Sequence, residues 1–215
     1  PDVTPLISYA FSAAYDFPAI EPVAKDTTWA EGFGSWGLIE GDGNAAALER
    51  ATGGLLIGAE TDSGPWRMGA LIGYGRSSYE ISDSSSSAES SSYIAGVYGG
   101  GRFGDLSVRG GLAYALNDVT AERTVALPGL TEELSASYLA GTVQAFGEIA
   151  YRLEVGAARF EPFANLAYVS TGHDGYAEEG GASALTIDAA RHGVPFTTLG
   201  TRIEHTVLLG EAEAT

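Results

Sequence analysis

The sequence predicts an all-β protein, an antiparallel up-and-down transmembrane β-barrel of the outer-membrane type. Three observations carry this prediction. Apolar and polar residues alternate with a period of two in about eight segments, as in strands that have one apolar and one polar face. Short and long connections alternate between these segments, and aromatic residues recur at eight-residue spacing on the apolar parity.

The strands are expected to follow a lead-in over residues 1–27. Pro5, Pro18 and Pro22 surround a stretch there that fits either a short helix or an extended segment. From residue 28 onward, one period-two segment follows another. We place the strands at 28–38, 50–60, 65–79, 91–102, 105–117, 136–153, 158–171 and 194–208.

The connections between these segments differ in length. Three are short, at 61–64, 103–105 and 154–157, and the long polar ones are at 39–49, 80–90, 118–135 and 172–193. In an up-and-down meander, this alternation places all long loops at one end, as in barrels with short periplasmic turns. The serine run at 82–92 has little to bury and is expected to be a mobile loop.

The stretch PWRMGALIGYG at 65–75 shows the two faces of one strand. Its even parity runs from Trp66 to Tyr74 and is apolar, whereas its odd parity is mostly glycine. At 3.3 Å per residue and a tilt near 40°, eight residues climb roughly 20 Å, close to the height of an apolar membrane band. The residues expected to face lipid or form aromatic girdles are Trp66, Met68, Ile72, Tyr74, Leu112, Tyr114, Phe160, Leu166 and Tyr168.

Polar side chains gather on the opposite parities. A wet lumen lined by charges of both signs accommodates them, and glycine there lets a plug or a bulky neighbouring side chain approach the wall. The residues expected to face the lumen are Glu31, Arg67, Arg109, Gln144, Glu148, Arg152, Glu161, Asn165 and Arg202.

The composition of the chain argues against several classes of protein. Asp and Glu number 28 against 11 Lys and Arg, for a net charge of −17, so nucleic-acid binding is not expected. The chain has no cysteine and therefore no disulfide framework. No apolar run approaches the roughly 18–20 residues of a transmembrane helix, which excludes a helical membrane protein.

The short motifs do not indicate chemistry. GFGSWG at 32–37 matches a dinucleotide fingerprint, but it lies inside a predicted strand rather than between a strand and a helix. His173-Asp174 has no serine elbow near it in the sequence, and the acidic pairs Glu132-Glu133 and Glu178-Glu179 lack the ligand spacing of a calcium loop. We therefore expect no catalytic, cofactor or metal site.

Four longer stretches together resemble the β-domain of bacterial autotransporters, the type Va secretion proteins. They begin with WAEGFGSWGLIEGDGN, YIAGVYGGGRFGDLSV, LSASYLAGTVQAFGEI and FEPFANLAYVSTGHDG, and the closing FTTLGTRI at 196–203 fits as well. The resemblance covers nearly everything after residue 28.

The resemblance implies an outer-membrane barrel of about twelve strands, threaded by an α-helix that connects to an upstream passenger domain on the cell surface. The implied partners are outer-membrane lipids, that passenger and the β-barrel assembly machinery, with the long loops outside the bacterial cell. Residues 1–27 would then be the lead-in from the lumen helix, and residues 28–215 a partial barrel with about eight strands. The family continues for roughly four more strands and normally ends on an aromatic residue, so we expect a fragment lacking the last strands; self-cleavage is not carried over.

The expected function is therefore a translocator that anchors and exports a passenger and has no catalytic site of its own. A passenger-free porin-like or adhesive barrel is one alternative, and an open lumen would favour it. A soluble acidic β-sandwich with binding loops is another, which requires a second sheet over Trp66, Ile72 and Leu166.

Overall fold

The computed structural model describes residues 26–41, 46–81, 86–156, 158–205, 207–209 and 212–214. The lead-in expected over residues 1–27 lies outside these ranges except for Asp26 and Thr27, which begin the first strand. Among the residues that the structure describes, no helix has the length and apolarity needed to cross a membrane.

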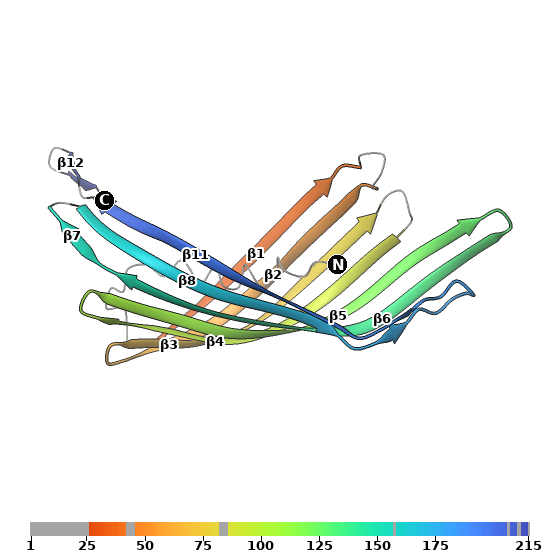
Figure 1. Ribbon diagram of the computed structural model, residues 1–215, viewed down its shortest axis with the longest axis horizontal. Helices are drawn as coiled ribbons and strands as arrows, with labels where there is room; N and C mark the ends of the chain where they lie inside the picture. The colour runs from red at the N-terminus through yellow and green to blue at the C-terminus, as the bar shows by residue number, and fades with distance from the viewer. Residues whose placement is uncertain are drawn as a thin grey trace.

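Eight long strands form one antiparallel sheet in which each strand pairs with its neighbours along the chain (Figure 1). They are β1 (Asp26–Ile39), β2 (Leu48–Ser63), β3 (Trp66–Ile81), β4 (Ser86–Phe103), β5 (Leu106–Leu127), β6 (Leu130–Tyr151), β8 (Ala158–His173) and β11 (Ala190–His205). The short β7 (Leu153–Val155) pairs with β8 in the same register as β6. Two small ladders join β9 (Tyr176–Ala177) to β10 (Thr186–Ile187) and β12 (Val207–Leu209) to β13 (Ala212–Ala214). The predicted all-β, up-and-down arrangement is confirmed.

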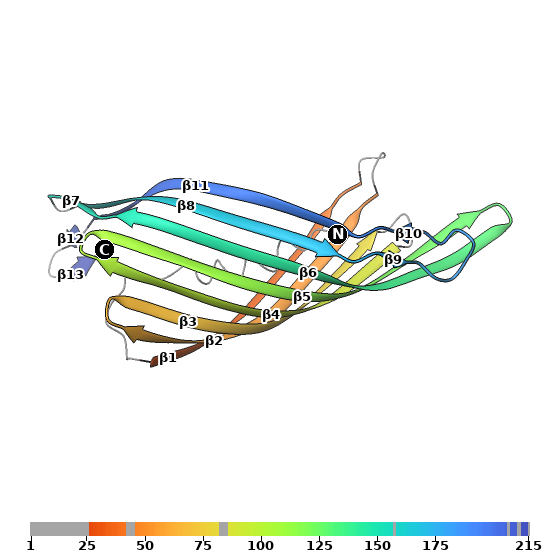
Figure 2. The ribbon, with the colours of Figure 1, turned by 60° about the horizontal axis from the view of Figure 1, so that its bottom comes forward.

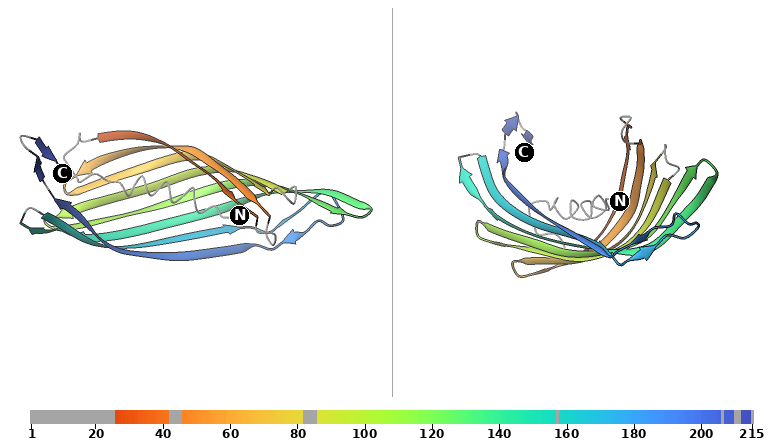
Figure 3. Two further views of the ribbon diagram at one scale, coloured as in Figure 1. Left: turned by 90° about the horizontal axis from the view of Figure 1, so that it is seen from above. Right: turned by 45° about the vertical axis from the view of Figure 1, so that its right-hand side comes forward.

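The sheet curls into an open trough with a concave and a convex face (Figure 3). Within the described residues, β1 and β11 form the two edges of this sheet. Sheet curvature of this kind follows from the right-handed twist of strands and brings side chains on the concave face close together. A cluster of buried apolar side chains lies on that face: Leu56, Leu71, Ile94, Tyr98, Ala113, Ala115 and Phe146.

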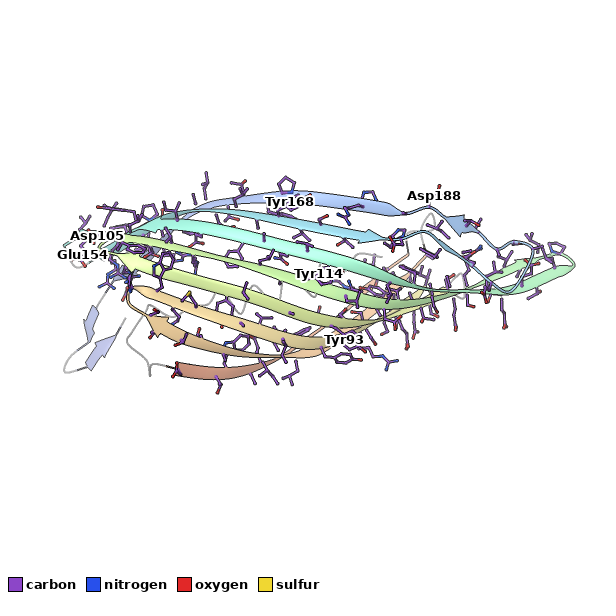
Figure 4. The ribbon with its side chains drawn as sticks, turned by 90° about the horizontal axis from the view of Figure 1, so that it is seen from below. Tyr93, Asp105, Tyr114, Glu154, Tyr168 and Asp188 are labelled. Atoms are coloured by element: carbon purple, nitrogen blue, oxygen red, sulfur yellow. The ribbon has the colours of Figure 1, made fainter. Side chains whose placement is uncertain are left out.

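The three short connections are tight turns at one end of the trough. Gly64, Gly104 and Gly156 adopt φ values of 61°, 63° and 64°, which other residues rarely adopt. Figure 4 shows Asp105 and Glu154 together at this turn end, with Asp188 towards the opposite end. The predicted segregation of short and long connections is therefore present.

Two predicted loops are wrong in part. Most of segment 118–135 is strand, because β5 and β6 stay paired up to Leu127 opposite Leu130, with Gly129 in the turn. Likewise, Ser86–Ser92 pairs within β4, although the rest of the serine run, 82–85, lies outside the described residues. In 118–124 the outward residues are polar and Val119 is buried on the concave face, the reverse of the apolar-outward pattern, whereas Ser86–Ser92 is polar on both faces.

The connection between β8 and β11 is also largely ordered (Figure 2). The pair Thr186–Ala177 continues the register of Ala190–His173, so β9 and β10 prolong the β8–β11 hairpin beside β6. Ser135 bridges Glu179, whereas the Ala140–His173 register of β6 and β8 would place it opposite residue 178. One extra residue on the β8 side therefore acts as a bulge and exchanges the two faces beyond it.

Candidate functional site

The concave face carries a row of ion pairs near the turn end. One carboxylate oxygen of Glu148 lies 2.7 Å from Arg109 and 2.8 Å from Arg202. Arg202 also bonds Glu161 at 2.9 Å, and Arg102 approaches Glu161 at 3.8 Å. These residues come from five strands, β4, β5, β6, β8 and β11, so the row ties distant parts of the curved sheet together.

Several buried polar atoms in this region have no hydrogen-bond partner among the described residues. They include Oε2 of Glu148, Nδ2 of Asn165, Oε1 of Gln144 and Nε of Arg152. Glu148 and Asn165 are direct cross-strand partners and are 6% and 3% exposed. Buried polar groups without partners are costly, so this wall is suited to contact a polar group or water inside the trough.

A band of small hydrogen-bonding side chains crosses the concave face further from the turns. Ser92 donates to Asn117 at 2.7 Å, and the Asn117 amide donates to Thr142 at 3.3 Å and to the carbonyl of Ala140 at 3.2 Å. Thr142 lies 3.2 Å from Thr171 on the next strand. Ser92, Asn117 and Thr142 are 0%, 1% and 0% exposed, so these groups form a buried polar network that links four adjacent strands.

Glycines on the concave face are covered by side chains from neighbouring strands. A Cβ on Gly69 would lie 2.5 Å from the Tyr98 ring, and one on Gly54 would lie 2.5 Å from the Phe33 ring. Trp29 covers Gly58 in the same way, and its indole N–H donates to the Tyr98 hydroxyl at 2.7 Å. The bulky neighbouring side chain anticipated from the sequence is therefore the occupant at these positions.

The convex face is apolar and exposed over its middle. Ile72 is 65% exposed and Leu166 60%, whereas the neighbouring concave Leu71 is 6% exposed. Figure 4 looks onto this face and shows Tyr93, Tyr114 and Tyr168 spread across it.

Aromatic pairs lie at both ends of the convex face. The Tyr74 and Tyr93 rings are 5.5 Å apart on one side, and Trp66 meets Phe103 edge-on at 5.3 Å near the turns. Two such levels match the positions that aromatic residues take at the two membrane interfaces.

The predicted site residues separate by strand parity as expected. The structure places Glu31, Arg67, Arg109, Gln144, Glu148, Arg152, Glu161, Asn165 and Arg202 on the concave parity. It places Trp66, Met68, Ile72, Tyr74, Leu112, Tyr114, Phe160, Leu166 and Tyr168 on the convex parity, with Phe160 the least exposed. Contact of one set with lipid and of the other with a lumen stays a prediction.

The concave residues do not form one cluster. Arg109, Glu148, Glu161 and Arg202 come together, whereas Arg67 binds Asp62 in a bidentate pair with distances of 2.8 and 3.2 Å. Sequence reasoning missed Asp62, which faces Arg67 across a turn only two residues long. It also missed Trp29 and Tyr98, although glycines on the adjoining strands carried a signal.

A second cluster lies at the end opposite the turns, on the concave parity. Arg123 holds Glu178 through two bonds of 2.8 and 2.6 Å. This side-chain hydrogen bond, with a second from the Leu185 N–H, lowers the pKa of Glu178 to about 2. The Tyr138 and Tyr176 rings stack 4.0 Å apart beside it, and burial raises the pKa of Tyr138 to about 12.

Within the described residues, no group of three or more His, Cys, Asp or Glu side chains is arranged to hold a metal ion. The GFGSWG motif lies wholly inside β1, where successive residues alternate between the two faces. His173 and Asp174 sit beside the bulge, and the His173 ring contacts Tyr138 and Tyr176.

Comparisons with known sequences agree with this architecture. The sequence model of a family described as "Autotransporter beta-domain" matches residues 28–215. A protein named "Extracellular serine protease" from Serratia marcescens is 36% identical over 177 residues, which is 82% of this chain and 17% of that protein. A second protein of that name and organism is 34% identical over 179 residues, with the same shares. The chain thus spans 17% of the length of these curated relatives.

Two solved structures share the fold. The translocator domain of autotransporter NalP from Neisseria meningitidis matches with a TM-score of 0.64 at 17% identity, over 94% of this chain and 68% of that one. The β-domain of the Bordetella autotransporter BrkA matches with a TM-score of 0.56 at 17% identity, over 87% of this chain and 74% of that one.

Proposed function

The chain belongs to the autotransporter β-domain family of outer-membrane barrels, and from this premise we propose that it anchors and exports an upstream passenger domain. The observation that carries the proposal is one curved sheet whose convex face is apolar and exposed, while its concave face carries paired charges beside the buried apolar cluster. A barrel in lipid must expose an apolar band and pair its backbone groups by strand hydrogen bonds. A polypeptide in transit needs the opposite, a polar passage.

The convex face supports a lipid environment. No second sheet covers Ile72 or Leu166 in the part of the chain that the structure describes, since the other two sheets are two-stranded ladders. In water, so large an exposed apolar surface would mark an interface or promote aggregation. The soluble β-sandwich expected as an alternative lacks its second layer here, and the family match contradicts it.

The concave face supports a role in guiding a chain. Charges of both signs are paired along it, and buried polar atoms of Gln144, Glu148 and Asn165 have no hydrogen-bond partner among the described residues. Such a wall has little basis for selecting among passenger sequences. We therefore propose that its contacts with the passenger are weak and not sequence-specific.

This proposal assigns no catalysis to the chain. The relatives named as extracellular serine proteases match over 17% of their length, and we propose that their proteolytic activity resides outside the matched part. The upstream passenger of the present protein, its activity and its substrate would likewise be separate from the β-domain.

The test is surface display from intact cells. The full polypeptide that carries this domain is produced in a Gram-negative host, and protease added outside the cells is expected to remove the passenger while leaving the barrel in the membrane. Protection of the passenger until the cells are broken would refute export. A barrel that reaches the membrane with no upstream domain attached would favour the passenger-free alternative.

The membrane topology has a separate test. This chain lacks cysteine, so single cysteines at Ala70 and Leu71 can carry spin labels for measurements of membrane depth. The label at Ala70 is expected to report lipid and the label at Leu71 the barrel interior. Equal lipid exposure at both positions would contradict the two faces.

A further inference from the structure

The tip of the β8–β11 hairpin, residues 179–184, folds across β6 at the end opposite the turns. Gly180 has a φ of 117°, and its backbone lies directly over Glu133 and Leu134. A side chain at Gly180 would collide with the carbonyl of Glu133. Leu134 beneath it is only 2% exposed. Glycine at this position is therefore what allows the tip to lie flat on the concave parity.

Three residues of the β5–β6 hairpin hold this tip by its main chain. Ser135 and Glu179 exchange two backbone hydrogen bonds of 2.9 and 2.8 Å. The two carboxylate oxygens of Glu132 accept from the N–H groups of Ala182 and Ser183, at 2.9 and 2.8 Å.

Arg123 completes the set by donating to the carbonyl of Ser183 at 3.1 Å. Each of these hydrogen bonds is made to a backbone group of the tip, and Glu132 also interacts with the Ser183 side chain. The nearby Arg123–Glu178 ion pair involves a side chain that precedes the tip. The surface thus holds the tip mainly through its main chain, with glycine at positions 180 and 181 where the two segments approach most closely.

We propose that Arg123, Glu132 and the edge of β6 at Ser135 form a binding site for polypeptide main chain at the mouth of the trough. The tip occupies this site in the structure, and a segment of the emerging passenger displaces it during export. The inference rests on the proposed export function and adds to it a defined contact for the passenger.

The position of the site and its backbone hydrogen bonds both favour the passenger as the segment that replaces the tip. The site lies at the end away from the short turns; Arg123 and Glu132 lie on the parity that continues the inner wall, and Ser135 contributes its backbone at the edge of β6. Strand addition to an exposed edge gives affinity through backbone bonds, while specificity comes from side-chain pockets. This site supplies such backbone bonds, and its side-chain requirement is limited to small residues where the two segments approach most closely, at Gly180 and Gly181.

A reversible covalent lock tests the exchange. The double variant Ser135→Cys with Glu179→Cys joins the two bridged positions, and a disulfide there holds the tip in place. In the full polypeptide, oxidation is expected to cause loss of passenger surface display, and a reducing agent to restore it. The fraction locked is measured on the same sample by gel mobility with and without reductant.

The matched control is Thr120→Cys with Ser137→Cys. These residues are cross-strand partners on the same hairpin, with hydroxyl oxygens 3.5 Å apart, so their disulfide leaves the tip free. Normal membrane insertion of both variants shows that folding is intact. Unchanged display from the locked tip, beside normal display from the parent chain, would overturn the exchange alone. Absence of display from the parent chain would instead refute the export function and the exchange with it.

Discussion

The unfolding free energy lost when a charged side chain is placed on the convex face shows whether that face lies in lipid or in water. Ala70 is exposed on this face between Ala59 and Val97, four residues from both Trp66 and Tyr74. With a 3.3 Å rise and a tilt near 40°, it lies roughly 10 Å from each aromatic level, close to the middle of an apolar band. Arginine at such a depth costs about 2–4 kcal/mol.

The control for Ala70→Arg is Ser78→Arg on the same face of β3. Ser78 lies four residues beyond Tyr74, roughly 10 Å outside the band, where arginine costs about 0–1 kcal/mol. Both variants are made in the complete barrel, and unfolding in urea from lipid vesicles is followed by tryptophan fluorescence.

The expected result is a loss of unfolding free energy at Ala70 alone. A variant at Ile72, nearer the Tyr74 level, should fall between the two. If arginine at Ala70 and at Ser78 destabilises the barrel equally, within about 0.5 kcal/mol as for two water-exposed sites, the lipid assignment of the convex face is wrong.

Two further changes probe the concave side. Gly69→Ala places a Cβ 2.5 Å from the Tyr98 ring and is expected to lower the unfolding free energy by about 1–3 kcal/mol through overpacking. The control is Gly147→Ala, which has no neighbour within 4 Å and should change stability by less than about 0.5 kcal/mol. Equal urea midpoints for the two variants would show that the Tyr98 ring does not occupy the Gly69 position. The pKa of Glu178 is lowered from 4.5 to about 2 when the tip is docked. The ionised carboxylate therefore stabilises the docked tip fully above pH 4.5, and this stabilisation is lost as the pH falls towards 2. The protection of the tip amides from hydrogen exchange, relative to their intrinsic rates at each pH, should fall over that interval. Arg123→Met should reduce this pH dependence and leave the part due to Glu132, whose pKa is also lowered by its hydrogen bonds to the tip. An identical profile in the variant would contradict the role of the ion pair.

The two faces were predictable because the side chains of a strand alternate with a period of two, and the strand order because short connections join strands that pair with each other. Trp66, Met68, Ala70, Ile72 and Tyr74 all lie on the exposed parity, whereas Leu71 between them is buried on the other face. The same rule failed over 118–135. Beyond the aromatic level, the outward residues Asp118, Thr120 and Glu122 are polar and so were not distinguished from a loop.

The second cluster was not predictable at all. Tyr176 and Glu178 reach the concave parity only because one extra residue beside Asp174 and Gly175 exchanges the faces. A bulge leaves no periodic signal, and the partner Arg123 lies 55 residues away in sequence. Glu148 lies on the concave parity, but its position between two arginines depends on the register of three further strands.

The covering of glycines by rings from the next strand has a consequence for how such a sequence can change. The space beside each of these glycines is filled by a side chain of the neighbouring strand, so Gly69 can gain a side chain only when position 98 loses one. Replacements at the two positions should therefore be strongly non-additive, each harmful alone and tolerated together. Mutational drift along the inner wall is then expected to proceed by compensating exchanges across a strand boundary, which would appear among descendants as correlated gains and losses of bulk.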